Sequence, residues 1–158
     1  MSTNNLSTFL NLSKIPTTSF YENLVSDFIK KELKDIGVKF QIDTWGNIEA
    51  YIPGELPNEL VFISHMDHPG FEIVENIEKN IYKAKCLGGL PRHSEMNNTN
   101  VITFNSENQI RGKILPTDAI KEKKSNDRWL DSKYVFIELD EKVNKIPTPV
   151  VFSLPDPI

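Results

Sequence analysis

Apolar residues recur at helical intervals in the first part of the chain. Their spacing predicts an amphipathic helix over residues 20–36 and a short helical turn at residues 6–12. Ser19 and Glu22 have the spacing of a capping box, in which the serine side chain would bind the backbone at the start of the helix. Gly37 is expected to end the helix, because glycine readily adopts the left-handed conformation found at that position.

Alternating residues then predict a β-hairpin, with strands at residues 39–43 and 48–52 and a turn at Trp45-Gly46-Asn47. The next apolar segment, residues 60–63, contains no polar position. A short run of bulky apolar residues predicts a strand buried on both faces, as in a parallel sheet. The first 67 residues are therefore expected to form a helix, a hairpin and a core strand.

The pattern changes after Gly70, where no later segment has a convincing helical period and residues 118–124 allow one or two turns at most. Short alternating segments separated by turns predict a small β-barrel or sandwich. Residues 146–158 contain four prolines, so we expect an extended linker there in place of a packed element. The predicted strands are 71–74, 81–85, 101–104, 110–115 and 134–139.

Composition adds the class of protein. The chain has 158 residues, 39% hydrophobic and 25% charged, which is typical of a soluble globular protein. The formal net charge of −4 is spread over segments of mixed sign, which argues against a nucleic-acid partner. The sequence shows neither a signal-peptide start nor a membrane-spanning apolar stretch, so we expect no membrane association. Cys86 is the single cysteine, so an intrachain disulfide is impossible and a cytoplasmic location is favoured.

The strongest candidate for chemistry is the pair His65 and Asp67, which directly follows the predicted core strand. Open α/β sheets bind their ligands at the carboxyl ends of strands. An imidazole there can bind a metal ion, and a carboxylate two residues later can hold the ring or a neighbouring ligand in place. The pattern is short, and Asp67-His68-Pro69-Gly70 is also a favourable turn sequence. A surface turn is therefore the alternative interpretation.

Six short motifs follow one another along the chain. They are Pro16-Thr-Thr-Ser19-Phe-Tyr-Glu22, Asp43-Thr-Trp-Gly46-Asn47, His65-Met-Asp67-His-Pro-Gly70-Phe71, Gly88-Gly89, Ile110-Arg-Gly112-Lys-Ile114 and Val135-Phe-Ile-Glu-Leu-Asp140. In this order the chain resembles the amino-terminal half of the tetrahedral aminopeptidases, co-catalytic metallopeptidases that include glutamyl and deblocking aminopeptidases. The resemblance implies the first part of an α/β metallopeptidase domain, residues 1–70, then an inserted β-barrel-like dimerisation domain, residues 71–150. Residues 151–158 would be a linker that returns to a catalytic segment beyond this chain.

The resemblance also implies an activity. Family members hydrolyse the amino-terminal peptide bond of peptides with two zinc or cobalt ions and a water that the metals activate. His65 would be a metal ligand, and Asp67 would hold that ligand in place without binding the metal itself. The remaining ligands and a glutamate base would lie after Ile158, so we expect an incomplete first half that is inactive alone. A homo-oligomer, either a dimer or a larger assembly, is implied as well.

Two other functions stay open at this point. A non-catalytic assembly module would use residues 71–150 for self-association and keep His65 and Asp67 as a remnant. Another His-x-Asp amidohydrolase, of the carboxypeptidase or deacylase type, would carry further catalytic-domain sequence soon after Asp67, and the long β-rich stretch argues against it. His93 and the segment 126–128, Asn-Asp-Arg, are expected to be loop residues and not metal ligands.

Overall fold

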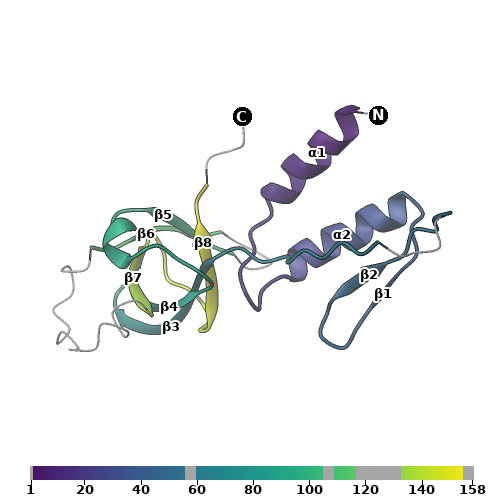
Figure 1. The fold of residues 1–158 in the computed structure, drawn as a ribbon. Helices are drawn as coiled ribbons and strands as arrows, with labels where there is room; N and C mark the ends of the chain where they lie inside the picture. Colours follow the sequence, from purple (N-terminus) through teal and green to yellow (C-terminus); the bar gives the residue numbers. More distant parts are fainter. Residues whose placement is uncertain (1, 56–59, 105–108, 117–132, 155–158) are drawn as a thin grey trace. The chain divides into compact units, whose positions relative to one another are not determined.

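The computed structural model of the chain describes residues 2–55, 60–104, 109–116 and 133–154. The chain forms two compact units (Figure 1). The helix–hairpin unit comprises residues 1–15 and 22–66, and the barrel unit comprises residues 16–21 and 67–158. The predicted division into a catalytic-domain part, an inserted domain and a linker stays a prediction.

The helix–hairpin unit contains two helices and a two-stranded antiparallel sheet. Helix α1 spans Ser2–Ser13, so it is longer than the predicted turn, and α2 spans Asn23–Asp35, which confirms the predicted helix with a later start. Strands β1 (Phe40–Ile42) and β2 (Ile48–Ala50) pair as the predicted hairpin. Among the described residues of this unit, Val25 on α2 is the only buried apolar residue.

The sequence predicted the end of α2 correctly but not the cap at its start. The predicted capping box is wrong, because Glu22 occupies the cap position and no side chain caps the helix there. Phe20, between Ser19 and the helix, has a φ of +74°, so the residues before the helix form a turn. At the other end Gly37, also with a φ of +74°, ends the helix as predicted.

The apolar run, residues 60–63, forms no strand in the structure, although all four residues are described. Their exposed fractions are 79% for Leu60, 70% for Val61, 88% for Phe62 and 92% for Ile63. The prediction of a buried core strand is therefore wrong for this structure. A strand buried on both faces needs strands beside it and helices over it. The only strands in the described part of this unit are the two short strands of the hairpin, and they pair with each other.

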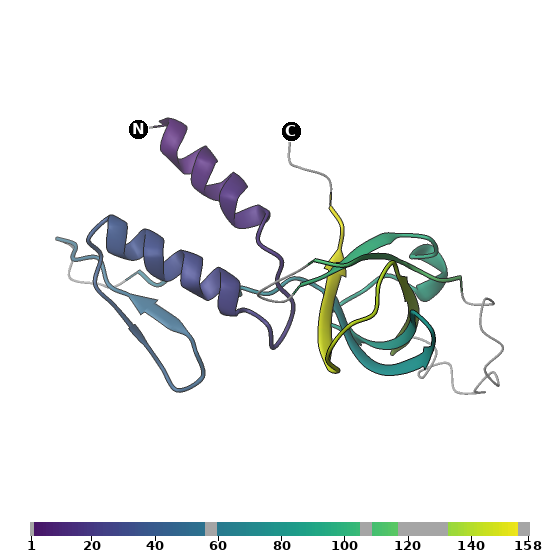
Figure 2. The same cartoon turned by 180° about the vertical axis from the view of Figure 1, so that it is seen from behind.

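The barrel unit contains six antiparallel strands that close in the order β3-β4-β7-β6-β5-β8. Figure 2 shows this barrel from behind. The structure confirms the predicted β-rich module and identifies it as a barrel, so the chain has a mixed α/β fold. Closure removes free sheet edges, which would otherwise invite pairing with other chains. The strands are β3 (Gly70–Glu78), β4 (Ile81–Leu87), β5 (Asn100–Thr103), β6 (Arg111–Ile114), β7 (Tyr134–Leu139) and β8 (Thr148–Phe152).

Strand β8 lies where the sequence predicted an extended linker, and for residues 148–152 that prediction is wrong. The strand pairs with both β3 and β5 and so closes the barrel. Val150 is completely buried. Pro149 is tolerated in the strand because its carbonyl still accepts a hydrogen bond, from the Phe104 N–H at 3.4 Å, although proline has no N–H to donate.

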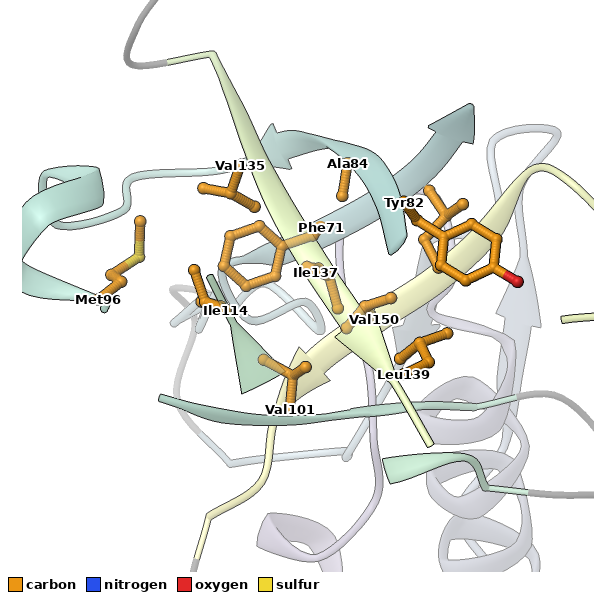
Figure 3. Close-up of a cluster of buried hydrophobic side chains, with 11 residues drawn as sticks. Phe71, Tyr82, Ala84, Met96, Val101, Ile114, Val135, Ile137, Leu139 and Val150 are labelled. Carbon is orange, nitrogen blue, oxygen red and sulfur yellow. The ribbon is translucent and has the colours of Figure 1, made fainter. Parts of the chain in front are cut away.

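Side chains from all six strands fill the interior of the barrel (Figure 3). The ring of Phe71 packs edge-on against Phe152, with 5.3 Å between ring centroids and an angle of 74°. Cys86 packs against this core, and burial raises the pKa of its thiol to about 11. The fully or almost fully buried core residues are Phe71, Ile73, Tyr82, Ala84, Met96, Val101, Ile114, Val135, Ile137, Leu139 and Val150.

The predicted turns at residues 118–124 and the segment 126–128 lie outside the described residues.

Neither of the two described α-helices has the length and apolar character needed to cross a membrane. A cytoplasmic location stays a prediction.

Candidate functional site

The second segment of the barrel unit begins at Asp67, and this carboxylate is bonded to the unit's first segment, residues 16–21. The Ser19 hydroxyl donates a hydrogen bond to Oδ2 of Asp67 at 2.5 Å. Both residues are half-buried and both belong to the barrel unit. Hydrogen bonds from a hydroxyl to a carboxylate are short and stronger than those between neutral groups. One of the two predicted site residues is therefore held by a specific partner.

A tight turn presents the Ser19 hydroxyl. The Tyr21 N–H donates to the carbonyl of Thr18 at 2.9 Å, which closes a four-residue turn with Ser19 and Phe20 at its centre. Phe20 has a φ of +74°, as the third residue of a type II turn requires. A bulky residue rarely adopts this conformation, and such strain persists only where surrounding contacts enforce it.

Two contacts fix the turn to the start of β3. The Tyr21 hydroxyl donates to the Glu72 carboxylate at 2.6 Å. Burial, together with the hydrogen bond and the charge of Glu72, raises the pKa of Tyr21 to about 12. Gly70 faces Thr18 so closely that an added Cβ would lie 2.7 Å from the threonine Oγ1 and 2.8 Å from the carbonyl oxygen of Val150. Only glycine fits between the turn and strand β8 at this point.

Three contacts therefore follow one another along the same two segments. Thr18 meets Gly70, Ser19 meets Asp67 and Tyr21 meets Glu72. Thr18 is completely buried, and its hydroxyl oxygen has no hydrogen-bond partner. The turn, residues 18–21, is thus packed against the strand start as a unit.

His65 belongs to the helix–hairpin unit, in the segment that follows the apolar run, and its side chain is exposed. The predicted pair therefore spans the boundary between the two compact units. His93 lies in a short 3₁₀ helix, His93–Glu95, where its Nε2 is 2.9 Å from the carbonyl oxygen of Leu115. That imidazole is engaged with the backbone of the barrel unit.

The donor types of His65 and Asp67 fit a zinc or cobalt ion, because imidazole nitrogen and carboxylate oxygen are common ligands of both. Within the described ranges, however, no group of three or more His, Cys, Asp or Glu side chains could hold a metal ion. A complete metal site therefore requires ligands in addition to those that the described residues bring together.

The sequence did not predict the bond between Ser19 and Asp67. Ser19 stands three residues before Glu22, and this local spacing favoured a helix cap. The available signal was the position of Ser19 in the first of six motifs and of Asp67 in the third. That order by itself does not place the two residues in contact.

The fold is similar to solved tetrahedral (TET) aminopeptidases. The Pyrococcus horikoshii TET1 peptidase, which can assemble into a tetrahedron or a large octahedral shell, matches with a TM-score of 0.71 and 22% identity over 94% of this chain and 46% of its own. Aminopeptidase APDkam598 from the archaeon Desulfurococcus kamchatkensis matches with a TM-score of 0.70 and 20% identity over 95% of this chain and 43% of its own.

A TET aminopeptidase from a marine sediment archaeon, Thaumarchaeota archaeon SCGC AB-539-E09, matches with a TM-score of 0.74 and 16% identity over 94% of this chain and 44% of its own. No model of a known protein family and no curated protein matches the sequence. The chain spans just under half the length of these solved chains. The likeness confirms the resemblance predicted from the six motifs and shows that this chain has the fold of part of a tetrahedral aminopeptidase.

Proposed function

We propose that this chain is part of a metal-dependent aminopeptidase that releases amino-terminal residues from peptides. The observation that carries the proposal is the similarity of fold to one solved peptidase and two solved aminopeptidases over at least 94% of the chain. The sequence His65-Met66-Asp67 supports it, because it supplies a metal-binding imidazole and a carboxylate at the spacing expected of such a site.

In this proposal His65 binds one of two divalent ions, zinc or cobalt, and Asp67 orients that ligand. When bound, the two ions would lower the pKa of a water and polarise the scissile carbonyl. Asp67 suits its role because Ser19 restrains its carboxylate. By the same resemblance the other ligands and the general base would come from sequence outside residues 1–158, so the 158-residue chain is expected to be inactive by itself.

We also propose that the complete protein is a homo-oligomer, a dimer or a larger assembly. Support comes from the solved TET1 peptidase, which can assemble into a tetrahedron or a large octahedral shell, and from the solved PhTET1-12s, a dodecamer in the asymmetric unit. Analytical ultracentrifugation is expected to show species larger than a monomer. A strict monomer at high protein concentration would contradict this part of the proposal.

The test of the enzyme is reconstitution with metal. The natural protein that contains residues 1–158 is stripped with a chelator and assayed on a panel of aminoacyl-p-nitroanilides, before and after Zn²⁺ or Co²⁺ is added. We expect turnover only with metal, loss of turnover in His65→Ala, and retention in the control His68→Ala, which removes a neighbouring exposed imidazole. Absence of metal-dependent turnover on the whole panel, or an active His65→Ala variant, would refute the proposal.

A further inference from the structure

We infer that Ser19 is a positioning residue for Asp67, and that the strained turn at residues 18–21 exists to aim its hydroxyl at this carboxylate. The inference rests on the proposed function, because Asp67 is the residue that would orient the metal ligand His65. It goes beyond that function by assigning a role to Ser19, which is not one of the proposed metal ligands.

Ser19 does not cap helix α2, although its spacing from Glu22 suits a cap. A serine shortly before a helix ordinarily caps it, and a cap stabilises the helix. In this structure α2 has no side-chain cap, although Ser19 and Glu22 have the capping spacing. The hydroxyl instead donates to Asp67, 48 residues further along the chain, at 2.5 Å. The hydroxyl that the sequence spacing would assign to a helix cap is therefore bonded to a residue of the candidate site.

The backbone at Phe20 is strained. Its φ of +74° is unfavourable for a bulky side chain, and its ring is 80% exposed. The conformation therefore does not serve to bury the ring in the core. What it achieves is the turn closed by the Tyr21 N–H and the Thr18 carbonyl, which directs the intervening Ser19 side chain toward Asp67.

The turn is anchored independently of Ser19. Tyr21 bonds to Glu72 at 2.6 Å, and Thr18 packs against Gly70. The serine hydroxyl is thus delivered from a fixed frame, as accurate orientation of a carboxylate requires. Removing the hydroxyl should remove this restraint on Asp67 without dismantling the turn.

The experiment compares three variants of the natural, metal-loaded protein. Ser19→Ala removes the hydroxyl, Ser19→Thr keeps a hydroxyl at the same position, and Tyr21→Phe breaks the neighbouring bond to Glu72 while leaving the Ser19–Asp67 bond in place. We expect Ser19→Ala to lower kcat, or the affinity for Zn²⁺, by about 10- to 100-fold with KM nearly unchanged. Ser19→Thr should restore most of the loss, and Tyr21→Phe should lose less than Ser19→Ala, because the packing of Thr18 on Gly70 still holds the turn.

A second readout needs neither metal nor activity. In the metal-free protein, NMR couplings report the χ1 rotamer of Asp67, which should be single in the wild type and in Ser19→Thr and averaged in Ser19→Ala. An unchanged rotamer in Ser19→Ala, or an equal loss of kcat in Tyr21→Phe, would overturn the inference. Because the rotamer is measured without metal, this result is independent of the His65→Ala assay, in which the proposed function itself succeeds or fails.

Discussion

The barrel unit and the helix–hairpin unit use their apolar residues in opposite ways. The barrel unit buries the side chains of its inward-facing strand positions in one continuous core and leaves no sheet edge. In the described part of the helix–hairpin unit Val25 is the only buried apolar residue, while the apolar run at residues 60–63 is exposed. Exposed apolar patches of this kind mark surfaces that contact other groups. The barrel unit therefore buries its core side chains against one another, whereas the helix–hairpin unit leaves the apolar run exposed.

The sharpest test of this contrast is a pair of phenylalanine substitutions. Phe71→Ala removes a completely buried ring that packs on Phe152 and should cost the barrel about 3–5 kcal/mol of unfolding free energy. Phe62→Ala removes an exposed ring of the apolar run and should change the free energy by less than about 0.5 kcal/mol. Urea denaturation followed by circular dichroism measures both. Equal losses of unfolding free energy in the two variants would mean that the apolar run is packed as closely as the barrel core.

A smaller effect is expected where the turn meets the barrel. Gly70→Ala would push a methyl group against Thr18 and the carbonyl of Val150, which should cost about 1–3 kcal/mol. Gly89→Ala is the control, because an added Cβ there meets open space. Thermal unfolding of the two variants should show a lowered midpoint for the first only. A tolerated Gly70→Ala would show that the close packing of the turn on β3 is not required.

Alkaline titration tests the second anchor of the turn. The pKa of Tyr21 is raised from 10.0 to about 12, so the folded state holds this proton more tightly than the unfolded state. The resulting stabilisation is present below pH 10 and is lost as the pH rises from 10 to about 12. Urea midpoints should therefore fall more steeply over this range in the wild type than in Tyr21→Phe. Parallel pH profiles would show that the Tyr21–Glu72 bond does not contribute to stability.

The smallest effect is expected in the hairpin. Asp43 accepts hydrogen bonds from the backbone N–H groups of Trp45 and Asn47 at 2.8 and 2.9 Å, and its bond with the Asn47 side chain is the main cause of its lowered pKa. This local stabilisation is present above the usual pKa of Asp43 and is lost as the pH falls through the lowered value.

Asp43→Ala should therefore speed amide exchange at Trp45 and Asn47 without affecting the barrel, and Thr44→Ala serves as the control. Slower or unchanged exchange at Trp45 and Asn47 in Asp43→Ala would contradict the assignment of these bonds.

The sequence predicted the elements that depend on local signals. Helical spacing and Gly37 gave the body and the end of α2, and alternation gave the hairpin and five of the six barrel strands. The sequence predictions failed where contacts between residues far apart in the chain determine the structure. Ser19 bonds to Asp67 instead of capping α2, and β8 forms despite its proline because β3 and β5 pair with it on both sides. Burial of the apolar run depends on neighbouring strands, which local pattern cannot supply.

The candidate site was predicted in the same uneven way. His65 and Asp67 were identified from their spacing after an apolar run, and the fold likeness to aminopeptidases supports the resemblance that gave them roles. The partner that holds Asp67 was not predicted. A residue 48 positions away became visible only when the fold brought the turn at residues 18–21 against the start of β3.

The central claim is tested most directly by mass spectrometry of the products that the natural, Co²⁺-loaded protein containing this chain releases from a peptide with a free amino terminus. We predict stepwise release of residues from the amino terminus, and loss of that release in His65→Ala. Cleavage inside the peptide or at its carboxyl terminus instead, or undiminished release by His65→Ala, would contradict the claim.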